Sequence, residues 1–308
     1  MERLDKIAKL HGSVVALVTP VSETPPHDID IEALKRLVSW HIDEGSDGLV
    51  VMGTTGESPT VTEEEWKTVV SVCVAVAGGR LPVIAGTGTN CTAVTVERTR
   101  LASALGADAA LVVTPYYNKP TQQGLIAHFS AVAAAVPQLP IITYNVPGRT
   151  ACDLWPETLS EIVKRFPNVM GHKEASGDVV GKCTQIKNLL GSSFRVFSGE
   201  DAHTCEAMLN NVCDGVITVA GNVVPRLLHS MCAHAYAGDR RRALALNDKL
   251  RALYAALFIE PSPTAAKWLL ADMKRIPGGI RLPLLPLSRK HHETVRQALQ
   301  EATAEAFS

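Results

Sequence analysis

The sequence predicts an α/β fold, a closed (β/α)8 (TIM) barrel that carries a C-terminal helical extension. Eight short apolar runs alternate with helix-like segments. The runs are continuously apolar, as parallel strands covered on both faces should be. Eight such units without a large insertion favour a closed barrel over an open doubly wound sheet. The predicted strands lie at residues 13–18, 48–52, 81–85, 109–113, 140–144, 169–173, 196–198 and 215–219.

The segments between the runs carry the signals of amphipathic helices. Residues 30–44 open with an acidic first turn. Residues 62–77 begin with Thr62, followed three residues later by Glu65, which is a capping box. We therefore expect a helix after each strand.

The strand pattern stops at about residue 225, and three helix-like segments follow it at 226–237, 239–257 and 264–273. We therefore expect a catalytic barrel over residues 1–224 and a helical extension over residues 225–308 that packs on it.

The composition is typical of a globular enzyme without a polyanionic partner. The 30 basic and 31 acidic side chains leave a net charge of -1, so binding to nucleic acid or to an anionic membrane is not expected. The charged N-terminal residues do not resemble a secretory signal, and no apolar run reaches the roughly eighteen residues of a transmembrane helix. Seven cysteines without a C-x-x-C pair favour free thiols in the cytoplasm.

Lys173 is the most informative residue, because it ends the sixth predicted strand, where a barrel places its active site. A lysine facing the barrel interior would be desolvated, which lowers its pKa and allows the neutral amine to attack a carbonyl. A surface lysine, or one paired with Glu174, explains the position about equally well. Strand alternation sends the neighbouring His172 to the opposite face, where we expect it to pack against a helix.

Other candidate site residues follow the neighbouring strands. Tyr144 ends the fifth strand and can shuttle protons, although an aromatic residue capping the core is at least as plausible. Arg149 suits a substrate carboxylate, or is a solvated loop charge. The Gly-Thr-Thr-Gly-Glu motif at 53–57 offers the hydroxyls of Thr54 and Thr55.

No cofactor and no metal are expected. The glycines at 86–88 do not complete G-x-G-x-x-G, because Cys91 occupies the final glycine position. Cys205 and Cys213 lie near His203, but without the tight spacing of a zinc site. His203 with Glu206 is a weak hint of a metal-dependent aldolase, and a solvated helix face explains the pair better.

Together these residues resemble the dihydrodipicolinate synthase / N-acetylneuraminate lyase family of pyruvate-dependent aldolases, over nearly the whole chain. The motifs that carry the resemblance are Gly-Thr-Thr-Gly-Glu-Ser at 53–58, Thr-Pro-Tyr-Tyr-Asn-Lys-Pro at 114–120, Tyr-Asn-Val-Pro-Gly-Arg-Thr at 144–150, Lys-Glu-Ala-Ser-Gly at 173–177 and Gly-Val-Ile-Thr-Val at 215–219.

The resemblance implies a role for each residue. Lys173 would form an imine with pyruvate. Tyr144 would donate and accept the proton through Thr54 and through Tyr117, the last reaching in from a neighbouring subunit of a homodimer or homotetramer. Substrate binding would fall to the remaining residues: Thr55 and the backbone at Ile217 for pyruvate, Arg149 for the carboxylate of an aldehyde substrate, and Gly199 as a further binding residue.

Within the family, the details resemble the branch that joins pyruvate to L-aspartate 4-semialdehyde in lysine biosynthesis. A sister aldolase or dehydratase acting on sialic acid, keto-deoxy sugar acids or related keto acids stays open as the alternative, as does a non-catalytic barrel. Lysine-inhibited members carry histidine and glutamate where this chain has Glu63, Trp66 and Val94, although Ser58, Asn90 and Tyr116 remain. We therefore expect weak or absent lysine feedback.

Overall fold

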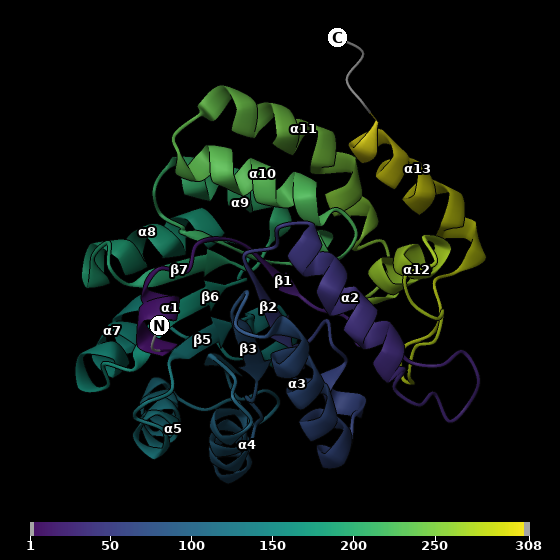
Figure 1. The fold of residues 1–308 in the computed structure, drawn as a ribbon. Coiled ribbons are helices and arrows are strands. Elements are labelled where there is room, and N and C mark those ends of the chain that lie inside the picture. Colours follow the sequence, from purple (N-terminus) through teal and green to yellow (C-terminus); the bar gives the residue numbers. More distant parts are fainter. Residues whose placement is uncertain (1–2, 305–308) are drawn as a thin grey trace.

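The structure is a computed structural model that describes residues 3–304, and these residues form the predicted closed barrel of eight parallel strands. Each strand pairs with the next, and β8 closes the barrel on β1. The predicted fold class is confirmed. Figure 1 shows the strands surrounded by helices. The strands are β1 (Gly12–Ala16), β2 (Gly48–Val51), β3 (Val83–Gly86), β4 (Ala109–Val113), β5 (Ile141–Asn145), β6 (Val169–Glu174), β7 (Arg195–Ser198) and β8 (Gly215–Thr218).

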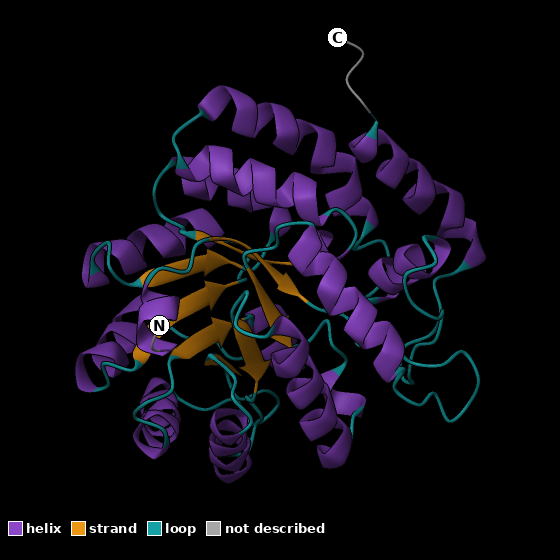
Figure 2. Ribbon diagram, in the orientation of Figure 1, coloured by secondary structure: helices purple, strands orange, loops and turns teal. Residues whose placement is uncertain are grey.

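The helices connect and cover these strands, as Figure 2 shows. They are α1 (Arg3–Ala8), α2 (Ile31–Asp43), α3 (Glu63–Ala77), α4 (Thr92–Ala104), α5 (Gln122–Ala135), α6 (Pro147–Thr150), α7 (Pro156–Arg165), α8 (Val179–Leu190), α9 (Asp201–Leu209), α10 (Pro225–Tyr236), α11 (Arg240–Ala256), α12 (Thr264–Asp272) and α13 (His292–Thr303). Single turns of 3₁₀ helix lie at Ser58–Thr60, Ala220–Asn222 and Arg289–His291.

Local sequence signals explain where the first long helices begin. The Asp30 carboxylate accepts the Ala33 N–H at 2.8 Å at the start of α2. Thr62 and Glu65 form the predicted capping box before α3, with each side chain accepting the other residue's N–H. Both caps satisfy backbone donors that have no partner inside the helix.

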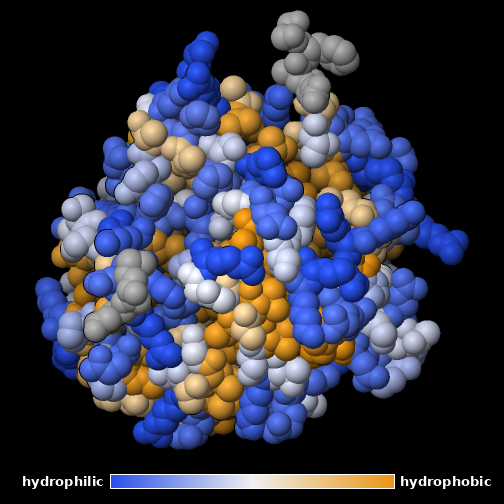
Figure 3. Space-filling view, viewed as in Figure 1, coloured by the Kyte–Doolittle hydropathy of each residue, from blue (hydrophilic) through white to orange (hydrophobic). Residues whose placement is uncertain are grey.

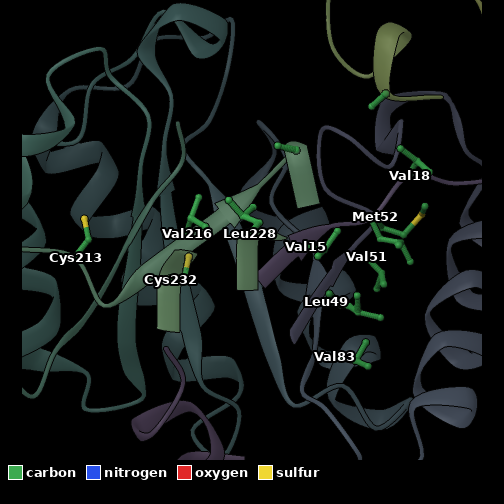
Figure 4. Packing of buried hydrophobic residues seen from close by; sticks show 14 of the residues in the cluster. Val15, Val18, Leu49, Val51, Met52, Val83, Cys213, Val216, Leu228 and Cys232 are labelled. Carbon is green, nitrogen blue, oxygen red and sulfur yellow. The ribbon is translucent and has the colours of Figure 1, made fainter. Parts of the chain in front are cut away.

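Alternation along the strands divides the core into two layers. Inward side chains such as Val14, Val50 and Phe197 fill the barrel, and Tyr144 belongs to the same inner cluster. Outward side chains pack beneath the helices. Figure 4 shows part of this outer layer, where Val216 lies near two side chains of α10. The labelled residues are Val15, Val18, Leu49, Val51, Met52, Val83, Cys213, Val216, Leu228 and Cys232.

The C-terminal helices cover one side of the barrel. Helix α10 contacts β1 and α9 and also runs beside α11, which in turn contacts α13. Helix α10 is the first helix of the proposed extension, and it contacts both the barrel and the rest of the extension. The division of the chain after residue 224 therefore stays a proposal.

Helix α13 was not predicted from the sequence. Its buried residues are Val295, Ala298 and Ala302, and two of these three are alanines, which leave only a weak apolar stripe. The short helices α1 and α6 were also not predicted.

Hydrophilic side chains cover most of the face in Figure 3, and hydrophobic ones show between them near its middle. Within residues 3–304, none of the helices combines the length and the apolar character needed to cross a membrane.

Candidate active site

A cavity of about 480 Å³ opens where the strands end, and six of the eight predicted site residues line it. The other wall comes from α11 and the segment after it. The cavity lies at the end of the barrel where enzymes of this architecture place their active sites. The six residues are Thr54, Thr55, Tyr144, Arg149, Lys173 and Gly199.

Lys173 is buried in this cavity, with 7% of its surface exposed. Burial lowers the pKa of the Lys173 amine to about 8, and the positive charge of Arg149 acts in the same direction, while the Asp201 carboxylate opposes both. A neutral amine is the form that attacks a carbonyl. The structure therefore favours a reactive amine over a surface lysine.

Tyr144 lies directly opposite Lys173 in the pairing of β5 with β6. The Lys173 ammonium nitrogen is 4.3 Å from the centre of the Tyr144 ring. Burial raises the pKa of the Tyr144 phenol to about 12, although Arg149 and a hydrogen bond with Thr54 act in the opposite direction. At neutral pH Tyr144 is therefore a proton donor beside the amine.

Thr54 and Thr55 stand in a tight turn that follows β2. The Gly56 N–H donates to the Gly53 carbonyl at 3.1 Å, and the Glu57 N–H donates to the Thr54 carbonyl at 3.1 Å. The turn leaves both threonines on the cavity wall. It is fixed by main-chain hydrogen bonds, which suits a site that must hold a small anion in one place.

Gly199 leaves the space that the Lys173 side chain occupies. A Cβ atom at Gly199 would lie 3.0 Å from Lys173 Cε and 2.7 Å from the Ala175 side chain. Both distances are tighter than ordinary van der Waals contact. A side chain at Gly199 would therefore crowd Lys173.

A buried polar network lies on the outer side of β5 and β6. His172 Nδ1 is 2.8 Å from Thr143 Oγ1, and His172 Nε2 is 3.2 Å from a Glu174 carboxylate oxygen. The Asn145 amide donates to both Glu174 oxygens at 3.2 Å. His172 thus lies away from the cavity, and Glu174 is occupied by His172 and Asn145.

Two predicted site residues are not in the cavity of the single chain. Tyr117 is 87% exposed and adopts a positive φ of 74°. It lines a separate surface depression, which it shares with Arg149. Ile217 is fully buried in the inner cluster and is absent from the cavity wall.

Several cavity residues were not among the predicted site residues. Asp201 follows Gly199 closely and is buried, and its carboxylate accepts the N–H groups of Val219 at 3.2 Å and Ala220 at 2.9 Å. Its place after the seventh predicted strand was the available signal. Tyr254 of α11 gave no such signal, because only the packing of the extension brings it to the cavity.

The structure also places the residues that the sequence analysis considered for a metal site and for lysine regulation. His203 Nδ1 lies 2.8 Å from a Glu200 oxygen, and residues 3–304 contain no cluster of three or more His, Cys, Asp or Glu that could hold a metal. Glu63 and Val94 line a depression between α3 and α4. Trp66 does not join them there, since it is fully buried and its indole N–H donates to the Gly86 carbonyl at 3.0 Å.

Comparisons with known proteins show the family to which this chain belongs. The model of the dihydrodipicolinate synthetase family matches residues 9–302. The 4-hydroxy-tetrahydrodipicolinate synthase of Methylococcus capsulatus is 48% identical, with 95% of this chain and 99% of that protein covered. The synthase of the same name from Nitrosococcus oceani is 50% identical, with coverage of 94% and 98%.

Among solved structures, the dihydrodipicolinate synthase of Acinetobacter baumannii in complex with pyruvate superimposes with a TM-score of 0.92. It is 44% identical, and the match covers 96% of this chain and 99% of that one. The resemblance predicted from the motifs is confirmed. The chain belongs to the dihydrodipicolinate synthetase family.

Proposed function

We propose that this chain is a 4-hydroxy-tetrahydrodipicolinate synthase that condenses pyruvate with L-aspartate 4-semialdehyde through an imine on Lys173. The observation that carries the proposal is the buried Lys173 amine, whose pKa is lowered to about 8 and which opens into a cavity beside Tyr144. The similarity to synthases of that name over more than nine-tenths of the chain supports the choice of substrates.

The chemistry begins with attack of the neutral Lys173 amine on the ketone carbon of pyruvate. Loss of water gives the imine, and loss of a proton from the pyruvate methyl group gives an enamine. The enamine carbon then attacks the aldehyde carbon of the second substrate and forms the new carbon–carbon bond. Attack of the substrate's own amine on the imine carbon closes the ring and releases Lys173.

Each proton in this sequence needs a nearby group that can give or take it. We assign that task to Tyr144, because its phenol is protonated at neutral pH and lies against Lys173. We assign the relay to Thr54 and, from a neighbouring subunit, to Tyr117. A positioned acid or base of this kind accelerates such a step by about 10²–10⁴-fold.

The remaining residues bind substrate in this proposal. Thr55 on the cavity wall holds pyruvate, and Gly199 admits the lysine that pyruvate reacts with. We assign the second pyruvate contact to the backbone of Ile217, because the side chain of Ile217 is buried in the inner cluster. Arg149 receives the carboxylate of the aldehyde substrate, because a guanidinium matches a carboxylate with two parallel hydrogen bonds.

We further propose a homotetramer or homodimer in the cytoplasm. The Tyr117 ring is almost fully exposed on a backbone with positive φ, a conformation that costs energy and is kept where it serves a site. A partner subunit that receives the ring would account for both features. All seven cysteines are free thiols, which suits a reducing compartment.

The test is product formation from pyruvate and L-aspartate 4-semialdehyde, followed by mass spectrometry. We expect a pyruvate-dependent cyclic adduct, and a borohydride-trapped pyruvate adduct on Lys173. Lys173→Ala should give neither product. Trapping without the cyclic adduct, in folded protein, would move the assignment to a sister aldolase with another acceptor. Absence of any trapped pyruvate adduct would favour the alternative that the chain is a non-catalytic barrel.

A further inference from the structure

A buried ion pair joins the turn that carries Thr54 and Thr55 to the C-terminal extension. Lys267 Nζ of α12 lies 2.5 Å from Glu57 Oε1, and the two side chains are 2% and 4% exposed. The other carboxylate oxygen, Glu57 Oε2, accepts a hydrogen bond from the main-chain N–H of Arg281 at 3.0 Å. Both oxygens of Glu57 are therefore bound by groups more than 200 residues away in the chain.

Glu57 controls the shape of the turn directly. Its N–H donates to the Thr54 carbonyl, and its φ of 57° lies in the left-handed region that side chains rarely adopt. The carbonyl of the preceding residue, Gly56, accepts a hydrogen bond from the Thr19 hydroxyl at 2.7 Å. The left-handed residue keeps its conformation only where its surroundings fix it, and the pair with Lys267 is one of the contacts that surround it.

Arg281 ties the same region together from a second side. Its guanidinium donates to the Thr60 carbonyl at 2.9 Å and to both oxygens of Glu65 at 2.5 and 2.9 Å. The segment from Glu57 to Glu65 is thus held to the extension at three points. Thr54 and Thr55 lie just before this segment, so its attachment to the extension limits how far their turn can move.

Two apolar side chains would hold the segments together about as strongly as a buried ion pair does. An ion pair differs in that separating its partners leaves an unpaired buried charge, which is strongly unfavourable, so the turn cannot move away from Lys267 without breaking the pair. The feature that needs fixed geometry here is the pair of hydroxyls of Thr54 and Thr55, three and two residues before Glu57, which line the same cavity as Lys173.

We propose that Glu57 and Lys267 are positioning residues of the pyruvate site, which hold the turn so that Thr54 and Thr55 face the amine of Lys173. The inference rests on the proposed function, since it assigns these hydroxyls to pyruvate and its protons. It gives the C-terminal extension a part in the reaction, although neither Glu57 nor Lys267 touches the substrate.

A matched control is present at the opposite end of the barrel. Lys187 Nζ lies 2.7 Å from Asp214, and these side chains are 12% and 10% exposed. Asp214 immediately precedes β8, far from the strand ends that form the cavity. Loss of this pair should weaken the fold without moving the hydroxyls.

The experiment compares Lys267→Met with Lys187→Met in the full chain. For each, urea unfolding gives stability, borohydride trapping over a range of pyruvate concentrations gives imine formation, and steady-state rates give kcat and KM. We expect Lys267→Met to lower kcat/KM for pyruvate by on the order of tenfold to a hundredfold, the usual effect of misplacing reacting groups. Lys187→Met should stay within about twofold of wild type, and Lys267→Arg should recover part of the loss.

Equal kinetic effects of the two Met variants, after correction for the folded fraction, would overturn the proposal, as would unchanged kinetics in folded Lys267→Met. If Lys267→Met does not fold, Glu57→Gln tests the same point, because it keeps the side-chain shape and removes the charge. Failure of the wild-type protein to form a pyruvate imine is a separate outcome, which removes the proposed function itself.

Discussion

Replacing Lys173 with methionine should make the protein more stable while it removes the reaction. The folded chain lowers the pKa of this amine from its ordinary value of 10.5 to about 8, mainly by burial. That fall corresponds to roughly 3 kcal/mol of folding free energy lost below pH 8. Methionine is close to lysine in length and carries no charge, so it should fill the same space without this loss.

The pH dependence gives the prediction its sign. Between pH 8 and pH 10.5 the unfolded chain holds a proton on this lysine and the folded chain does not. The unfolded state binds more protons there, so the stability of the wild type rises with pH in that window. The advantage of Lys173→Met should therefore fall from about 3 kcal/mol at pH 7 to about 1.4 kcal/mol at pH 9.5.

Urea unfolding of both proteins at one protein concentration, at pH 7 and pH 9.5, measures this difference. Lys35→Met is the control, because the Lys35 side chain is 45% exposed and pairs with Glu32 on the surface. Its effect on stability should be small at both pH values. An unchanged or lower stability of Lys173→Met at pH 7, or a gain independent of pH, would refute the idea that burial activates the amine.

Three further outcomes follow from the site. Arg149→Gln removes a positive charge that lowers the pKa of Lys173. The midpoint of the pH profile of borohydride-trapped imine should therefore move to higher pH, and a shift to lower pH would contradict this. The KM for the aldehyde should also rise. Tyr117→Phe should slow turnover by on the order of tenfold or more while trapping of pyruvate stays normal. Lysine should inhibit weakly or not at all in a rate assay, because Glu63, Trp66 and Val94 stand where the resemblance leads us to expect the histidine and glutamate of lysine-inhibited members. Inhibition at low lysine concentration would count against that reasoning.

The fold was predictable because its signals are local. Each strand is a continuous apolar run, and the ends of α2 and α3 are set by side chains within three residues, Asp30 and Thr62 among them. Helix α13 escaped prediction because the residues that it buries include the small Ala298 and Ala302. The contacts that stabilise α13 come from α11 and α12, and such tertiary contacts cannot be predicted from the local sequence pattern.

The site was predictable where it depends on strand alternation. Tyr144 and Lys173 end neighbouring strands and both point inward, so the pairing of β5 with β6 brings them together. Tyr254 and Lys267 come to the site only through the packing of α11 and α12 on the barrel. No spacing along the chain connects Lys267 with Glu57, so the ion pair had to come from the structure.

Burial is the property that separates the two interpretations of Lys173, and it belongs to the whole barrel. On the sequence, a lysine at a strand end fits a nucleophile and a surface residue equally well. In the structure, the inner cluster packs around the barrel interior and Tyr144 lies beside the Lys173 amine. Residues of α11 line the cavity that the amine faces. Glu174, the partner that would have kept it an ordinary ammonium, points the other way and binds His172 and Asn145. The same alternation that sends Lys173 inward therefore turns the carboxylate next to it in the chain away from it, which leaves Asp201 as the carboxylate that acts on the amine. Burial outweighs Asp201 and favours the neutral amine that imine formation requires.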